Sequence, residues 1–220
     1  MRKQTATCVI LATVVLSFVI VMPQPLCAQA SQGIELYNSW QFQEAEKVLR
    51  DALKTNPQDM QANYYLGLSV LMQDKHNEAL DIFLKVKEAQ DKADRQSRSQ
   101  VPDEYQIELA LARARLELKQ NEEAWKNLEA AKKVNPDAAD IHVYRGLYYL
   151  NLQNEQKAIK ELEKAMNLDG NNAYAHYFAG LAYIRLGNPS KAVEVLKEFL
   201  QLAPSAPEVD KAKALISALC

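Results

Sequence analysis

The residues of this chain best suited to acid–base chemistry or metal binding are its three histidines, His76, His142 and His176. His142 and His176 are 34 residues apart, which is also the period of a repeat found throughout the chain. A zinc site needs three or four ligands in a fixed geometry, and two equivalent histidines supply too few. We therefore interpret this pair as packing residues, and we expect no metal ion and no cofactor.

Motifs for covalent catalysis and nucleotide binding are missing from the sequence. Cys220 is the last residue and has no framework to activate its thiol. No serine stands in a Gly-x-Ser-x-Gly turn. All six glycines fall at positions of the repeat, so none remains for a phosphate-binding loop. The many carboxylates alternate with lysines, as on solvated helix faces. We expect that the chain is not an enzyme.

Composition favours a single helical domain. The chain has 220 residues, 48% hydrophobic and 25% charged, which is enough for one domain with its own core. Glycine is scarce, whereas alanine, leucine, glutamate, lysine and glutamine are plentiful, and these residues favour helix. No stretch has the pattern of a strand hairpin. The composition predicts an all-α fold.

The first 30 residues have the layout of a secretory signal. Arg2 and Lys3 are followed by an apolar run over residues 8–22, two prolines, and small residues that end at Ala30. We predict a signal peptide over residues 1–30, cleaved after Ala30, and an exported protein that is periplasmic or secreted. No membrane span would then remain. An uncleaved N-terminal membrane anchor is the alternative, although the run is shorter than the roughly 20 residues of a spanning helix.

Cleavage would change both the charge and the cysteine content. Lys and Arg would fall from 26 to 24 against 28 Asp and Glu, so the mature chain would carry a charge of −4. An acidic chain is poorly suited to binding polyanions, so we expect no nucleic-acid partner. Cys8 and Cys27 would leave with the signal. A lipoprotein, with Cys27 lipidated, is disfavoured because Gln24, Pro25 and Leu26 lack the small residue expected before such a cysteine. Cys220 would remain as a tolerated terminal residue or as the bridge of a dimer.

Short alanine motifs reveal the repeat. They recur at intervals of 34, 45, 34 and 34 residues, so one interval carries an insertion of 11. A small residue precedes each alanine by 12, and large apolar residues follow it by four. This spacing predicts two antiparallel helices per unit in close contact, with each hairpin covering the apolar side of its neighbour. The alanines are Ala45, Ala79, Ala124, Ala158 and Ala192, and the small residues are Gly33, Gly67, Ala112, Gly146 and Gly180.

These positions resemble the tetratricopeptide repeat (TPR), most closely over residues 173–206. The resemblance implies a right-handed α-solenoid of about five helical hairpins, with a TPR domain over residues 31–206. A polar insertion over residues 94–104 would be a solvated loop, a helix extension or a partner-contacting loop. Residues 207–220 would form a capping helix, with Pro207 in its first turn. The units are 26–59, 60–93, 105–138, 139–172 and 173–206, the first of which overlaps the signal peptide.

The resemblance also implies a binding surface. In the family, five positions of each first helix tend to face a concave groove, where a segment of a partner protein binds. Lysines and arginines that clamp a peptide carboxylate in some TPR proteins are missing here from the second, fifth and sixth positions of units two to five. The groove residues carried over are Gln61, Tyr64, Leu68, Met72, Gln106, Arg113, Asp140, Leu147, Asn151, Tyr174, Tyr177 and Arg185.

Three functions are compatible with these features. The leading hypothesis is an exported scaffold or adaptor of the cell envelope, which binds a protein or peptide segment in its concave groove. The second is a structural protein that assembles with itself as a homo-oligomer. The third is an accessory module that presents substrates to a separate enzyme.

Overall fold

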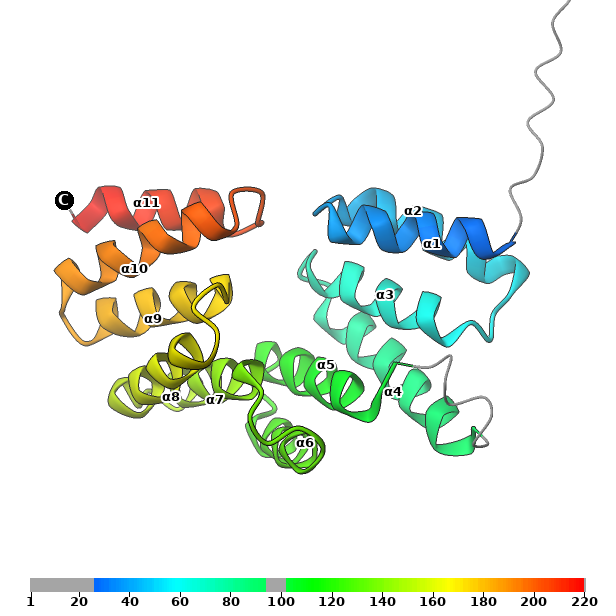
Figure 1. Ribbon diagram of the computed structural model, residues 1–220, viewed down its shortest axis with the longest axis horizontal. Coiled ribbons are helices and arrows are strands. Elements are labelled where there is room, and N and C mark those ends of the chain that lie inside the picture. Colours follow the sequence, from blue (N-terminus) through cyan, green and yellow to red (C-terminus); the bar gives the residue numbers. More distant parts are fainter. Residues whose placement is uncertain (1–25, 94–101, 220) are drawn as a thin grey trace, which may run out of the picture.

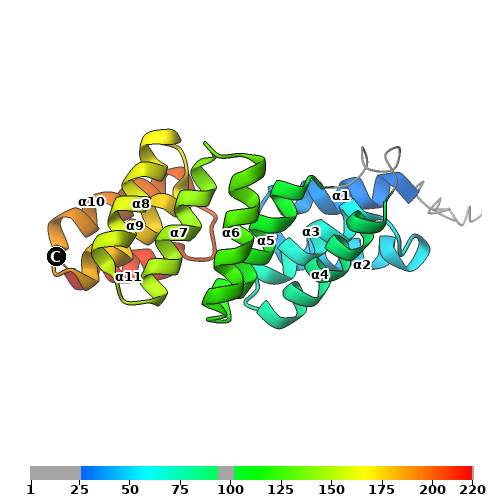
Figure 2. The same ribbon diagram turned by 90° about the horizontal axis from the view of Figure 1, so that it is seen from below.

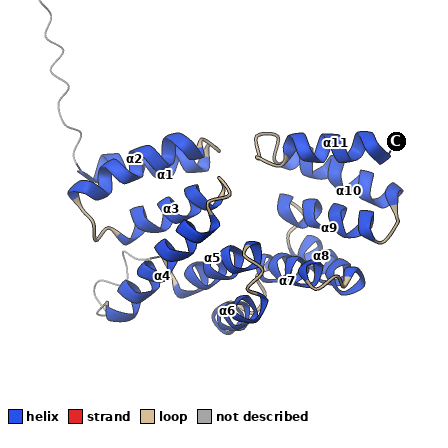
Figure 3. Ribbon diagram, turned by 180° about the vertical axis from the view of Figure 1, so that it is seen from behind, coloured by secondary structure: helices blue, strands red, loops and turns tan. Residues whose placement is uncertain are grey.

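The computed structural model describes residues 26–93 and 102–219, and every regular element in these ranges is a helix (Figures 1 and 3). Most of the predicted signal peptide, most of the insertion and Cys220 lie outside the described residues. The helices are α1 (Leu26–Asn38), α2 (Phe42–Thr55), α3 (Met60–Leu71), α4 (His76–Lys92), α5 (Glu104–Glu117), α6 (Asn121–Val134), α7 (Ala139–Asn151), α8 (Glu155–Leu168), α9 (Ala173–Arg185), α10 (Pro189–Leu202) and α11 (Val209–Leu219).

The helices form five consecutive hairpins and a final single helix, which confirms the predicted all-α solenoid. Each hairpin packs on the next, and the first helices of neighbouring units contact one another. Figure 2 shows the hairpins following one another along the molecule. In Figure 1 they trace an arc, and the pair α1 and α2 faces α11 across its opening.

Small residues hold the two helices of each hairpin close together. A Cβ atom placed on Gly146 would lie 2.5 Å from Cγ of Leu162, and Gly33, Gly67 and Gly180 meet their partners equally closely. The five repeat alanines are completely buried. The contact predicted from the 34-residue spacing is therefore confirmed. It explains why the chain tolerates no large side chain at the glycine position.

The turn inside each hairpin has one residue in the left-handed backbone conformation. Its φ is 76° at Gly187, but the same turn in the other units uses residues with side chains. Asp74 and Lys119 adopt φ values of 59° and 60° at this position. A left-handed conformation is costly for such residues unless the surrounding structure holds it. Two of the five turns thus place a charged residue, Asp74 or Lys119, just after the end of a first helix, which matters for the groove.

Prolines lie in the connections between units. Pro57 and Pro136 follow the ends of α2 and α6 and precede the next helix by two or three residues. The expectation that Pro207 occupies the first turn of the last helix is wrong, because α11 begins at Val209, whereas Pro189 does occupy the first turn of α10. Side chains cap the starts of some helices, as at Asp103, whose carboxylate accepts a hydrogen bond from the backbone amide of Gln106.

The last helix covers the end of the stack, as the sequence predicted. Ala212 is completely buried and Val209 is 9% exposed. Together with residues of α7 to α10, and with Leu116 of α5 and Ala124 of α6, they form one continuous apolar cluster, called the C-terminal cluster below. Trp40, from the turn of the first unit, also packs against this cluster. The arc is therefore curved strongly enough for its first unit to touch its last.

Buried polar side chains tie neighbouring units together. Glu108 on α5 is 3% exposed and accepts hydrogen bonds from Lys87 of α4, at 2.5 Å, and from Asn127 of α6. Burial opposes the charge of Lys87, but the hydrogen bond and charge of Glu108 outweigh it and raise the pKa of Lys87. Between units one and two, Glu46 accepts from Lys75 at 2.6 Å and from Gln73 at 2.9 Å.

Candidate functional site

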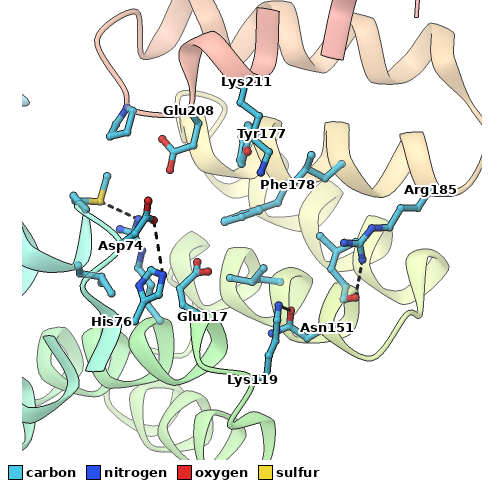
Figure 4. Close-up of a pocket in the computed structure, with 17 residues that line it drawn as sticks. Asp74, His76, Glu117, Lys119, Asn151, Tyr177, Phe178, Arg185, Glu208 and Lys211 are labelled. Carbon is cyan, nitrogen blue, oxygen red and sulfur yellow. Dashed lines mark hydrogen bonds and ion pairs between the residues drawn. The ribbon is translucent and has the colours of Figure 1, made fainter. Parts of the chain in front are cut away.

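The concave side of the arc contains a cavity of about 360 Å³, called the central groove below. Residues of α3, α5, α7, α9 and the start of α11 line it, as does the turn between α3 and α4 (Figure 4). Six of the residues that the family resemblance assigns to the binding face lie on its walls. They are Met72, Arg113, Leu147, Asn151, Tyr177 and Arg185.

Two of these six also connect neighbouring units. The amide of Asn151 donates to the carbonyl of Leu116 at 2.8 Å, and Arg185 donates to the carbonyl of Leu150 at 2.9 Å. Each bond joins the end of one first helix to the end of the preceding one. The two side chains therefore fix the spacing of units three, four and five while they line the groove.

Tyr177 offers little surface to a ligand. The residue is only 3% exposed, and its ring lies 5.5 Å from Phe178 and 5.0 Å from Phe199, measured between centroids. Burial and, less strongly, the charges of Glu208 and Glu117 raise the pKa of Tyr177 to about 12. The tyrosine therefore acts first as a core residue under the groove floor, whereas Leu181, one turn further along α9, is half-buried and lines the cavity.

Five other predicted groove residues line none of the cavities described here, and their role in binding stays a prediction. Gln106 completes the capping box of α5. Asp140 accepts a hydrogen bond from Asn172 at 2.8 Å. Tyr64 is 8% exposed and packs beside Phe83. The remaining two, Gln61 and Leu68, are half-buried on α3.

The groove also contains charged residues that the sequence analysis did not place there. Asp74, His76 and Lys119 come from the turns with left-handed residues or from the helix start that follows (Figure 4). Lys211 comes from α11, and Glu208 immediately precedes that helix. The 34-residue period located the turns but not their direction. The contribution of α11 depends on the curvature of the whole stack, for which the sequence has no local signal.

The charges around the groove are mixed. Lys119 donates to the side chain of Asn151 at 2.5 Å, and Nε2 of His76 lies 3.8 Å from Oδ1 of Asp74. Within residues 26–93 and 102–219, no group of three or more His, Cys, Asp or Glu side chains could hold a metal ion. His142 lies away from the groove, where its Nδ1 is 2.7 Å from a carboxylate oxygen of Glu161. The central groove therefore presents charged groups of both signs beside apolar side chains, which suits binding of a protein surface that has both polar and apolar parts.

A smaller cavity of about 210 Å³ adjoins the groove and is called the aromatic pocket below. It lies where the first unit meets the last, and Arg113 and Met72 line both cavities. Its rings are close together, with centroids 5.4 Å apart for Tyr37 and Phe42. The lining residues are Tyr37, Asn38, Trp40, Phe42, Met72, Arg113 and Tyr174, the last of which the family resemblance also assigned to the binding face.

Arg113 stands at the centre of this junction. Its Nη2 lies 2.9 Å from Sδ of Met72, and its Cζ lies 5.0 Å from the ring centroid of Tyr174. The hydroxyl of Tyr174 in turn donates to Glu208 at 3.2 Å. One arginine therefore joins residues of units two, three and five, and Tyr174 extends this contact to Glu208, just before α11.

None of the described helices combines the length and the apolar character that crossing a membrane requires. Comparison with curated protein sequences gives no match.

Several solved structures have a similar shape. TTC0263, a thermophilic TPR protein in Thermus thermophilus, superimposes with a TM-score of 0.69 at 24% identity, covering 89% of this chain and 99% of that one. MamA from Desulfovibrio magneticus RS-1 has a TM-score of 0.53 at 19% identity, covering 83% and 97%. YrrB, a TPR protein with an unusual peptide-binding site, has a TM-score of 0.50 at 20% identity, covering 85% and 92%.

Sequence models of the tetratricopeptide repeat match most of the chain. One matches residues 31–94 and 109–171, and another matches residues 151–216. The stretch between 94 and 109 that the first model skips contains the insertion deduced from the 45-residue interval. The repeat pattern, the hairpin structure and these matches agree, and the chain belongs to the tetratricopeptide-repeat family.

Proposed function

We propose that this chain is an exported scaffold that holds a segment of a partner protein in its central groove. The observation that carries the proposal is the cavity of about 360 Å³, to which four first helices and α11 contribute both apolar and charged side chains. Such a lining suits an extended or helical protein segment. YrrB, which has the same fold, contains a peptide-binding site, and a peptide is the same chemical class of ligand as the segment proposed here.

Export is the second part of the proposal, and it rests on the sequence of residues 1–30. Cleavage after Ala30 would shorten α1 by five residues and remove one buried alanine, which is 7% exposed. The remaining part of α1 keeps Gly33 at its contact with Leu49. Mass spectrometry of the protein recovered from the cell envelope tests this part. A chain that begins at Ser31 supports export with cleavage, and a chain that retains residues 1–30 in the cytoplasm contradicts it.

Site-specific photo-crosslinking in living cells tests the groove. A photoreactive phenylalanine analogue at Leu181 would point into the cavity. An analogue at Tyr177 would instead be buried in the core. Lys160, exposed on α8 and not among the groove residues, provides the matched control position.

A single protein trapped from Leu181 and not from Lys160 would support the scaffold and identify its partner. A product of twice the chain's own mass would favour self-assembly instead. If both positions trap the same mixture, or if Leu181 traps nothing, the groove is not the binding face.

A further inference from the structure

The aromatic pocket contains a single charged group. Arg113 is the only charged residue on its walls, which are otherwise aromatic rings, a thioether and the amide of Asn38. Within residues 26–93 and 102–219, no carboxylate oxygen lies within the 4.0 Å of an ion pair with its guanidinium. Burial opposes the charge of Arg113, but the neighbouring tyrosines and the charge of Glu117 outweigh it and raise the pKa of Arg113. The guanidinium is therefore charged and still lacks a carboxylate in direct contact, which an anionic ligand would supply.

The neighbours of Arg113 do not neutralise it. The sulfur of Met72 is a weak acceptor, and the side chains of Tyr174 and Tyr144 are hydrogen-bond partners of Arg113 that carry no formal charge at neutral pH. Tyr144 is also nearby, and burial raises its pKa to about 12, although the charge of Arg113 lowers it in part. These phenols are therefore uncharged at neutral pH. A guanidinium has five N–H groups, so donors remain for a ligand.

Two carboxylates of this chain lie on the other side of the arginine. Glu117 and Glu208 line the central groove and not the aromatic pocket. Glu208 accepts its hydrogen bond from Tyr174. Their negative charge disfavours an anion on the groove side, so an anionic ligand would reach Arg113 from the side of the aromatic rings.

We propose that the aromatic pocket binds a carboxylate attached to an apolar group, with Arg113 as its counter-ion. Two parallel N–H···O bonds from a guanidinium fit a carboxylate better than any other common anion in proteins except phosphate. The rings of Tyr37, Trp40 and Phe42 favour an apolar attachment over a bare anion. The volume of about 210 Å³ is below the range of about 300–1,000 Å³ for sites of drug-sized molecules, so it suits one side chain or one chain end.

This inference deepens the proposed function, and it rests on it for the source of the ligand. A partner segment in the central groove would place one acidic residue, or its own terminal carboxylate, in the adjoining pocket. The pocket differs from a repeated set of cations along the first helices, because it uses one arginine and the turn of the first unit. It exists only because the first and last units meet, so the ligand would also stabilise that contact.

Small probes test the pocket on the purified full chain, without knowledge of the partner. N-acetylphenylalanine represents a chain-terminal carboxylate, and N-acetyl-glutamyl-phenylalanine amide represents a side-chain carboxylate. Their neutral counterparts are N-acetylphenylalanine amide and the glutaminyl dipeptide amide. The indole N–H signal of Trp40 in a nuclear magnetic resonance titration reports binding, because Trp40 lines the pocket. The signal of Trp125, which packs on Tyr148 of α7, is the internal control.

We expect the Trp40 signal to move with at least one acid at a concentration about tenfold or more below that needed for its amide, because charged hydrogen bonds are the stronger ones. Arg113→Gln should abolish this preference, and the control Arg185→Gln, in the central groove only, should retain it. The acid that shows the preference identifies the source of the carboxylate.

Equal binding of acid and amide, or no movement of the Trp40 signal at millimolar concentrations, would overturn the inference. The acid–amide comparison on the unaltered chain needs no variant, so it holds even if Arg113→Gln fails to fold. If the chain shows no preference for the acid over the amide, the pocket inference fails, but the photo-crosslinking result from Leu181 still stands. A pocket that binds acids in a chain without a trapped partner would, conversely, remove the proposed function alone.

Discussion

The close contact between Gly146 and Leu162 allows a sharp test of the hairpin packing. Gly146→Ala adds one methyl group on α7. Its position would be 2.5 Å from Cγ, 2.7 Å from Cδ2 and 3.0 Å from Cδ1 of Leu162, which is completely buried. All three atoms belong to one branched end, so the whole leucine must move, and the surrounding core is closely packed.

The expected net destabilisation follows from two opposing effects. Overpacking of a well-packed core costs about 1–3 kcal/mol, and three simultaneous close contacts place this case near the upper end. Alanine in place of glycine inside a helix stabilises the helix by about 1 kcal/mol, which offsets part of this cost. We therefore expect Gly146→Ala to lower the free energy of unfolding by about 2 kcal/mol.

Gly170→Ala is the matched control. Gly170 lies in the turn after α8, its nearest neighbour to an added Cβ is the carbonyl oxygen of Met166 at 3.8 Å, and its φ is not positive. Alanine there should stabilise the chain by about 0.4–1 kcal/mol, because it restricts the unfolded chain without a clash. The two substitutions are chemically identical and should act in opposite directions.

Urea unfolding followed by circular dichroism measures both variants. With a slope of about 2 kcal/mol per molar urea, the midpoint for Gly146→Ala should fall by about 1 M. Units of a solenoid can unfold separately, so a selective loss in the C-terminal transition would also agree with the prediction. An unchanged midpoint would refute the reasoning, because Leu162 could then not be fixed against the backbone of α7.

Three further outcomes are expected. Glu46→Gln should lower the free energy of unfolding by on the order of 1 kcal/mol at neutral pH. Burial favours the neutral form of Glu46, but hydrogen bonds from Lys75, Arg50 and Gln73 outweigh it and hold the pKa of Glu46 below the ordinary 4.5. The stabilisation by Glu46 is therefore present above pH 4.5 and is lost as the pH falls further. Urea titrations at two pH values check this, and a pH-independent difference would contradict it. Glu108→Gln should cost about 1–3 kcal/mol, because Lys87 loses its counter-ion, and a variant as stable as the parent would argue against the buried network. Deletion of residues 207–220 should expose the C-terminal cluster and cause aggregation or early melting of unit five, whereas a soluble truncation with an unchanged Tm would disprove the capping role of α11.

The fold could be predicted from the sequence because the decisive contacts repeat. Gly33, Gly67, Gly146 and Gly180 recur at a fixed distance before a buried alanine, and each forms the same contact. Such a contact lies within one hairpin, so it depends on local spacing alone. The prediction that Pro207 lies in the first turn of the last helix failed for another reason. A proline fits the turn that precedes a helix as well as the first helical turn, and here α11 begins at Val209.

The binding face was only partly predictable. Position in the repeat placed Met72, Arg113 and Arg185 on the central groove, but it could not tell that Tyr177 would be 3% exposed. That burial depends on neighbouring units. The approach of Met72 to Tyr174, 102 residues away, depends on small rotations that accumulate from unit to unit, for which no single residue is responsible.

The meeting of the first and last units limits how this protein can change in length. In an ordinary repeat array each unit contacts only its neighbours, so the two ends do not constrain one another. Here the turn that contains Trp40 already packs against the C-terminal cluster, and α11 faces α1 and α2 across the opening of the arc. A sixth hairpin after unit five would have to displace α11 and then pass beside unit one. A change in the number of units would therefore alter the spacing on which the arginine-centred junction depends.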